Sequence, residues 1–224
     1  MRLLKRIINK IRSIKNVVFN WCRICAAACV TLVVRTHVRR WRKVAFAGTP
    51  SASWDERNKI IAGFIPAGSA VLDIGCGAQP LKRHLAAGCR YQPCDVIKST
   101  PEVIFCDLNR GIYPDVKERF DYVVCGGVFE YVRKPEEFLK KIPTLGNTTL
   151  MSYCPLYPGD SKLKRLGNGW GWVNHFKREE LENLFTEMGL KWSVLHIDRL
   201  QYLIYSIRPT GETQLQEKSR DVIK

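Results

Sequence analysis

Three short apolar segments, each ending at or beside an aspartate, constrain the fold of this chain more than any other feature. They read as strands that end near Asp73, Asp95 and Asp107. In an open α/β sheet, ligands bind at the carboxyl ends of the strands. The three carboxylates are therefore expected to lie around one ligand site.

Segments with the patterns of strands and helices alternate along residues 49–208, which predicts a doubly wound, mostly parallel α/β sheet. A helix is expected to begin at the capping box formed by Ser53 and Glu56. A short helix is expected from Pro80 to about Ala87. The remaining expected elements are strands at 70–74, 91–95, 103–106, 120–125 and 148–154, helices at 135–142 and 178–188, and a final strand pair at 192–197 and 200–207. Residues 209–224 form a polar tail that is expected to be disordered.

The turn after the first strand carries two glycines, Gly75 and Gly77, which let the backbone approach a ligand closely. Asp95 lies 18 residues beyond Gly77, the distance expected for a carboxylate that binds the two hydroxyls of a ribose. Gln79 and Pro80 stand where the dinucleotide-binding motif has its third glycine, which disfavours NAD as the ligand. An ordinary strand-to-helix turn with a solvated aspartate is the alternative.

Taken together, these segments resemble the class I methyltransferases that use S-adenosylmethionine (SAM). Residues 71–77, Val-Leu-Asp-Ile-Gly-Cys-Gly, are similar to the first motif of that family, and residues 91–95 to its second strand with the ribose-binding acid. Residues 105–108 are similar to the segment that contacts adenine, residues 120–139 to the fourth strand and the motif after it, and residues 179–190 to a late helix. The sequence departs from the family at Tyr131, where a histidine is usual, and at Gln79, where a glycine is usual. The likeness does not extend to residues 1–48.

The resemblance implies a Rossmann-like methyltransferase fold, SAM as the cofactor and no metal. The residues that it implies for cofactor binding are Asp73, Gly75, Cys76, Gly77, Asp95, Asp107, Leu108 and Gly126. Such an enzyme mainly has to align the acceptor with an already activated methyl group. An amine or hydroxyl acceptor can also need a general base.

Residues 155–176 follow the fifth predicted strand and are rich in glycine and aromatic residues. They suit a mobile lid or a surface that stacks on rings; the alternative is a loop whose aromatic side chains fold back on the core. His175 is the candidate general base of this segment. A histidine that only packs beside the following helix is the competing interpretation.

The positive charge of the chain is concentrated in an N-terminal arm, residues 1–48. Residues 1–54 hold 12 of the 36 lysines and arginines and no acidic residue. Apolar residues recur at helical spacing from Leu3 to Val18, and the apolar stretch 17–34 is marginal for a bilayer span and contains Arg23. Residues 1–43 are therefore expected to lie in, or dip into, one leaflet of an anionic membrane. The alternatives are a helix packed on its own domain, a cleaved signal peptide, a mitochondrial presequence and a nucleic-acid-binding arm.

Nine cysteines, an odd number without regular spacing, favour free thiols in a reducing compartment. Cys22, Cys25 and Cys29 share one helix face without a fourth metal ligand, so small apolar packing is expected there, with acylation as a second interpretation.

The sequence thus predicts a cytoplasmic, membrane-associated SAM-dependent methyltransferase that acts on a small-molecule, glycan or lipid-linked acceptor. The alternatives are an RNA methyltransferase with a basic arm and a non-catalytic SAM-binding module. Cys125-Gly126-Gly127-Val128 follows the fourth strand, in place of the Asn/Asp-Pro-Pro-aromatic motif of enzymes that methylate adenine amino groups.

Overall fold

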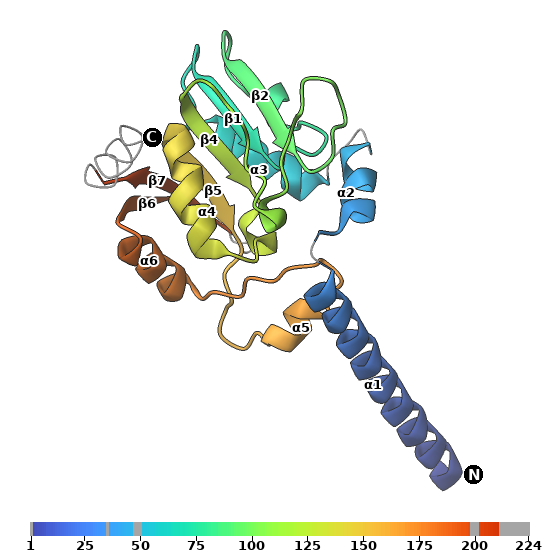
Figure 1. Cartoon of the computed structure of the whole chain (residues 1–224). Helices are drawn as coiled ribbons and strands as arrows, with labels where there is room; N and C mark the ends of the chain where they lie inside the picture. The colour runs from blue at the N-terminus through green and yellow to red at the C-terminus, as the bar shows by residue number, and fades with distance from the viewer. Residues whose placement is uncertain (1, 35, 47–50, 198–201, 211–224) are drawn as a thin grey trace.

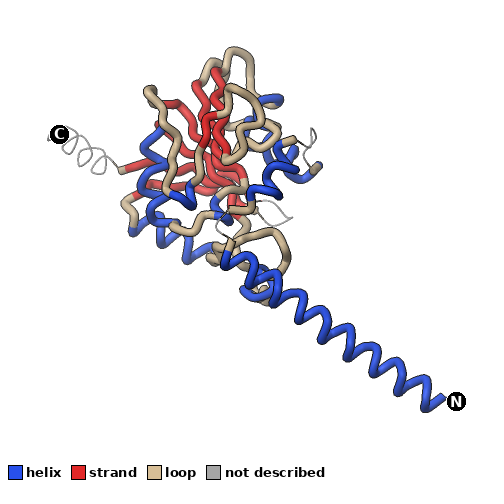
Figure 2. Tube along the Cα trace, turned by 45° about the vertical axis from the view of Figure 1, so that its right-hand side comes forward, coloured by secondary structure: helices blue, strands red, loops and turns tan. Residues whose placement is uncertain are grey.

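A seven-stranded sheet with helices on both faces forms the body of the protein, and one long helix projects from it (Figures 1 and 2). The structure is a computed structural model that describes residues 2–34, 36–46, 51–197 and 202–210. The strands are β1 (Ala70–Ile74), β2 (Arg90–Asp95), β3 (Ile104–Phe105), β4 (Phe120–Gly126), β5 (Gly146–Tyr153), β6 (Leu190–Ile197) and β7 (Leu203–Pro209). The helices are α1 (Arg2–Val33), α2 (Val38–Ala45), α3 (Ala52–Ala62), α4 (Pro135–Lys141), α5 (Lys162–Leu166) and α6 (Arg178–Glu187).

The strand order is β3-β2-β1-β4-β5-β7-β6, which confirms the predicted doubly wound sheet. β1 pairs in parallel with β2 and β4, and β4 pairs in parallel with β5. β7 runs antiparallel to both β5 and β6. The central strand β1 is buried along its whole length, because parallel strands are covered on both faces. The carboxyl ends of β1, β2, β4 and β5 therefore meet at one edge of the sheet.

Two apolar cores hold the helices to the two faces of the sheet. On one face, Phe138 of α4 and Phe185 of α6 pack in the core that contains Val123. On the other face, Ile61 of α3 packs in the core that contains Val124. Consecutive residues of β4 thus pack in opposite cores, because successive side chains of a strand point to opposite faces of the sheet.

Two local predictions are wrong. The helix expected from Pro80 to Ala87 is a single 3₁₀ turn, Leu81–Arg83; the chain then turns toward the start of β1, where the Ala87 carbonyl accepts a hydrogen bond of 3.1 Å from the Gly68 amide. α3 begins at Ala52 with Ser51 as its N-cap, so the capping box expected at Ser53 and Glu56 is not formed. The strand pair β6 and β7 is present, whereas Asp198, Arg199 and the tail from residue 211 lie outside the described residues.

The arm contains one continuous helix of 32 residues, α1, in place of separate amphipathic and apolar segments. Its last turns pack on α5: Ile24, Ala28 and Thr31 are buried, and the Thr31 hydroxyl donates to the Leu166 carbonyl at 3.2 Å. A Cβ atom on Gly167 would lie 2.4 Å from the Ile24 carbonyl oxygen, so the two helices touch at backbone distance.

The side chains of α1 from residue 9 to residue 23 are all exposed. Its exposed large apolar residues are Ile11, Ile14, Val17, Val18, Phe19, Trp21, Val30, Leu32 and Val33. Cys22, Cys25 and Cys29 are also exposed, so the packing role expected for them is wrong. All nine cysteines are free thiols.

Candidate functional site

A cavity of about 390 Å³ lies at the carboxyl ends of the parallel strands. Its volume falls within the range of about 300–1,000 Å³ that is typical of small-molecule sites. All the residues predicted to bind the cofactor line it: Asp73, Gly75, Cys76, Gly77, Asp95, Asp107, Leu108 and Gly126. The structure therefore brings together residues that span 54 positions of the sequence.

The glycine turn after β1 needs its glycines for backbone conformation and for space. Gly75 and Gly77 have φ angles of 73° and 52°, in the left-handed region. A Cβ atom on Gly75 would lie 2.5 Å from a methyl carbon of Val128. Gln79 also has a positive φ, 57°, and stands where the family usually has glycine. Gln79 thus keeps the left-handed backbone conformation that favours glycine. A residue other than glycine adopts this conformation at a cost of about 1–2 kcal/mol.

Asp95 ends β2 with its carboxylate directed at the glycine turn. One oxygen accepts a hydrogen bond from the Gly77 amide and the other from the Ile97 amide, each at 2.9 Å. Burial raises the pKa of Asp95, and these amide hydrogen bonds oppose that rise. The carboxylate is thus fixed in direction at the cavity wall, which is what binding of a ribose diol requires.

Asp73 is held by the chain itself. Its carboxylate accepts a hydrogen bond of 2.6 Å from the Tyr91 hydroxyl. Burial raises the pKa of Asp73 to about 7, and the Tyr91 hydrogen bond acts in the opposite direction. Asp73 is therefore buried near the end of β1 and is joined to β2 through Tyr91.

The arm supplies part of the cavity wall, which the sequence analysis did not predict. Thr36, Trp41 and Val44 all line the cavity. The Thr36 hydroxyl donates to the Asp107 carboxylate and lies 3.0 and 3.1 Å from its two oxygens. The Trp41 ring meets the Tyr131 ring edge-on, with 4.7 Å between centroids. The cavity thus includes residues on both sides of position 48, where the border between the arm and the domain is expected.

Arg133 fixes this part of the arm to the body. Its guanidinium donates to the carbonyl oxygens of Thr31 at 2.7 Å and Val34 at 2.8 Å, at the end of α1. Arg40 of α2 donates to the Gly169 carbonyl and stacks on the Trp170 ring, 5.3 Å from its centroid. The contacts of Arg40 hold α2, whose residues Trp41 and Val44 line the cavity, to the loop that follows α5. Figure 1 shows how α2 and this loop are placed in the fold.

Arg57 and Glu130 are two charged cavity residues whose roles the sequence analysis missed. Arg57 of α3 donates to the Gly126 carbonyl at 3.0 Å, while its Nε atom is buried and has no hydrogen-bond partner within the part of the chain that the structure describes. Glu130 lies in the 3₁₀ turn Phe129–Tyr131 that follows β4, and it is buried. Neither stood out in the sequence, because burial and unmet hydrogen-bonding capacity are properties of the folded chain.

His175 is not among the residues that line the cavity, to which its loop contributes Trp170 and Trp172. Both of its ring nitrogens are buried without a hydrogen-bond partner in the described structure. Burial lowers the pKa of His175 to about 4, with a smaller effect from Arg165, so the ring is neutral near pH 7. The catalytic role of His175 remains a prediction that this placement does not favour.

Comparison with known proteins matches residues 51–195 to the family described as a methyltransferase domain. The bifunctional methionine biosynthesis protein MetXA/MetW of Rhodopirellula baltica is 27% identical over 107 residues, which cover 40% of this chain and 17% of that protein. The chain therefore corresponds to only a small part of the length of that relative.

Several solved structures share the fold. The N-terminal domain of EvdMO1, crystallised with SAH (S-adenosylhomocysteine) and D-fucose, has a TM-score of 0.50 at 16% identity, over 72% of this chain and 85% of that one. A SAM-dependent methyltransferase from Aquifex aeolicus has a TM-score of 0.51 at 13% identity, over 75% and 97% of the two chains. CalO1, a methyltransferase of calicheamicin biosynthesis in its SAH-bound form, has a TM-score of 0.53 at 18% identity, over 70% and 54%.

Proposed function

Because this chain belongs to the methyltransferase domain family, whose members use SAM, we propose that it transfers the methyl group of SAM to a small-molecule, glycan or lipid-linked acceptor. The observation that carries this proposal is the single cavity at the strand ends. It joins the cofactor motif on β1 and β2 to an aromatic wall formed by Trp41, Trp170 and Trp172. Aromatic walls bind rings and apolar groups, which suits a small or lipid-linked acceptor.

The residues of the cavity fit SAM. Asp95 is oriented to accept hydrogen bonds from the ribose hydroxyls, and the glycine turn leaves the backbone open to the ligand. Asp107 and Leu108 line the same cavity, and we expect them to contact the adenine, as the family resemblance implies. The Nε atom of Arg57, which has no hydrogen-bond partner among the described residues, can donate to a carboxylate. When bound, SAM supplies a methyl group that is already activated by a sulfonium. The chain then has to orient the acceptor and keep water out.

The assay that tests the proposal uses the full chain with SAM that carries a labelled methyl group. Membrane lipid, glycan and RNA extracts are offered as separate acceptor fractions. We expect label in the lipid or glycan fraction. Label in RNA alone would instead support the RNA methyltransferase, and SAM binding without transfer to any fraction would support a non-catalytic module.

We further propose that α1 attaches the enzyme to an anionic membrane surface. Asn9–Val33 is long and apolar enough to cross a membrane by length and composition. The contact with α5 argues for one leaflet, because α5 and its exposed residues Lys162 and Lys164 cover the last turns of the helix and charged residues are costly in hydrocarbon. The turns of α1 before this contact carry Lys10, Arg12, Lys15 and Arg23, which are likewise costly in hydrocarbon.

Charge also favours a membrane over a second copy of the chain as the partner of this helix. α1 carries basic residues and no acidic residue. Two copies packed side by side would bring like charges together, whereas anionic lipid headgroups would neutralise them.

Full-length protein is therefore expected to pellet with vesicles of phosphatidylglycerol and phosphatidylcholine at low salt. High salt should release only part of it, because burial of apolar side chains is not screened as surface charge is. Sedimentation with and without vesicles, at both salt concentrations, measures this. Vesicles of phosphatidylcholine alone are the control. Protein that stays in the supernatant at low salt contradicts the membrane proposal.

A further inference from the structure

Glu130 is a buried carboxylate whose hydrogen bonds the chain completes on one side only. The residue is 2% exposed and lines the cavity. Its Oε1 atom accepts a hydrogen bond of 3.0 Å from the Cys154 amide, just beyond the end of β5. Its Oε2 atom is buried without a hydrogen-bond partner among the described residues. The Cys154 thiol and the amide of Glu130 itself also lie close to the carboxylate. A buried carboxylate oxygen is costly to leave unsatisfied, which indicates that a ligand of this cavity supplies the missing donor.

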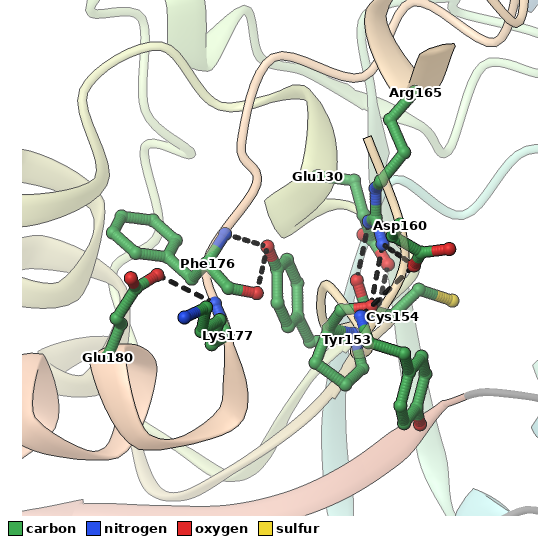
Figure 3. A network of polar contacts seen from close by, with 10 residues as sticks. Glu130, Tyr153, Cys154, Asp160, Arg165, Phe176, Lys177 and Glu180 are labelled. Atoms are coloured by element: carbon green, nitrogen blue, oxygen red, sulfur yellow. Dashed lines mark hydrogen bonds and ion pairs between the residues drawn. The ribbon is translucent and has the colours of Figure 1, made fainter. Parts of the chain in front are cut away.

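The groups around Glu130 do not neutralise it by direct pairing. Arg57 from α3 and Arg165 from α5 are near enough to act on its charge, but neither forms an ion pair with it in the described structure. Arg165 donates instead to the carbonyl oxygens of Cys154 at 2.7 Å and Pro155 at 2.6 Å (Figure 3). The other titratable neighbours, Tyr131, Tyr153 and Cys154, stay neutral because burial raises the pKa of each. Burial is also the largest influence on Glu130 and raises its pKa, while hydrogen bonds from its own amide and the Cys154 amide, together with the two arginines, oppose this rise.

The backbone of Glu130 also holds the aromatic loop, residues 155–176, close to the carboxylate. Its carbonyl oxygen accepts hydrogen bonds from the amides of Val173 at 2.8 Å and Asn174 at 3.1 Å. Trp172, the residue before them, lines the cavity. The carboxylate therefore lies in the cavity between the strand end after β4 and the loop that presents the aromatic wall.

We propose that Glu130 is the general base of the methyl transfer and takes the proton of a hydroxyl or amine acceptor on its Oε2 atom. The acceptor oxygen or nitrogen forms its new bond to the methyl carbon while the methyl–sulfur bond breaks and its electron pair passes to sulfur. The acceptor proton goes to the carboxylate, which becomes a carboxylic acid and later releases the proton to water. A carboxylate with a raised pKa is suited to this task near neutral pH. The assignment rests on the proposed methyltransferase function.

The test compares the full-length chain with Glu130→Gln, in the lipid or glycan fraction that accepts labelled methyl groups. Glutamine keeps an oxygen for the Cys154 amide but cannot take a proton. Turnover is expected to fall roughly 10²–10⁴-fold, while the affinity for SAH, measured by calorimetry, stays within about twofold. Glu136→Gln, an exposed glutamate of α4, is the matched control.

The pH profile separates catalysis from a structural role. Because only the carboxylate can take the proton and its pKa is raised, wild-type turnover should rise with pH through a range above that of an ordinary glutamate. The charged groups that face Glu130 are Arg57 and Arg165. Glu130→Asp should be slower but keep this rise, and Glu130→Gln should lose it.

Three results would overturn the assignment. The first is near wild-type turnover in Glu130→Gln, and the second is a wild-type profile without the rise. The third is a 10²–10⁴-fold loss in His175→Ala while Glu130→Gln stays active, which would return the role of base to His175. If wild-type protein binds SAH but labels no fraction, the proposed function itself fails, and the role of Glu130 fails with it. If Glu130→Gln does not fold, the pH profiles of turnover of the wild type and of Glu130→Asp test the assignment in its place.

Discussion

A chain that lacks residues 1–43 is expected to bind SAH at least about tenfold more weakly than the full chain, which corresponds to about 1.4 kcal/mol. The deletion removes Thr36 from the Asp107 carboxylate and Trp41 from the cavity wall. It also takes away the two carbonyl oxygens that hold the guanidinium of Arg133. Calorimetry measures the affinity, and circular dichroism shows whether the shortened chain folds.

A shorter deletion provides the control. Removal of residues 1–23 leaves the contact with α5 and the segment that covers the cavity, so SAH affinity should stay at the level of the full chain. Equal affinity in all three chains would show that the arm is independent of the cofactor site, as the sequence alone suggested.

Replacement of Asp95 by alanine is expected to lower the affinity for SAM at least about tenfold while the fold survives. The carboxylate is already oriented by the Gly77 and Ile97 amides, so it can accept from ribose hydroxyls without rearrangement. Charge-assisted hydrogen bonds are each worth about 1.5–3 kcal/mol. Calorimetric titration with SAM measures the loss.

The matched control is Glu118→Ala, which removes an acid from an exposed ion pair with Arg90, away from the cavity. It should bind SAM as the wild type does. If Asp95→Ala does so too, the ribose assignment is wrong.

The doubly wound, mostly parallel sheet and the residues at its strand ends could be predicted because both follow from local patterns. β1 is a buried apolar strand that runs directly into the glycine turn, β2 ends in Asp95, and Asp107 follows β3 closely. Those acids must meet at one edge once the strands are parallel. The single turn after Pro80 was missed because the chain beyond it is held by a contact between Ala87 and Gly68, which lie 19 positions apart.

The acceptor side of the cavity could not be predicted, since it depends on contacts between distant residues. Thr36 meets Asp107 across 71 positions, and the carboxylate of Glu130 meets the Cys154 amide across 24. Glu130 was seen as part of a family-like motif, but its unsatisfied oxygen exists only in the fold. His175 was chosen for its chemistry, and only the structure places it outside the cavity.

The contact between α1 and α5 has a consequence for the order of events during synthesis. The hydrogen bond from Thr31 cannot form until Leu166 has been added to the chain, 135 residues later. At about 5–20 residues per second, a ribosome needs roughly 7–27 s to make that stretch. Throughout this time the basic, apolar helix has emerged without the body on which it packs. If α1 binds anionic lipid as proposed, the nascent chain can reach the membrane before the sheet exists, and the enzyme then folds where it works.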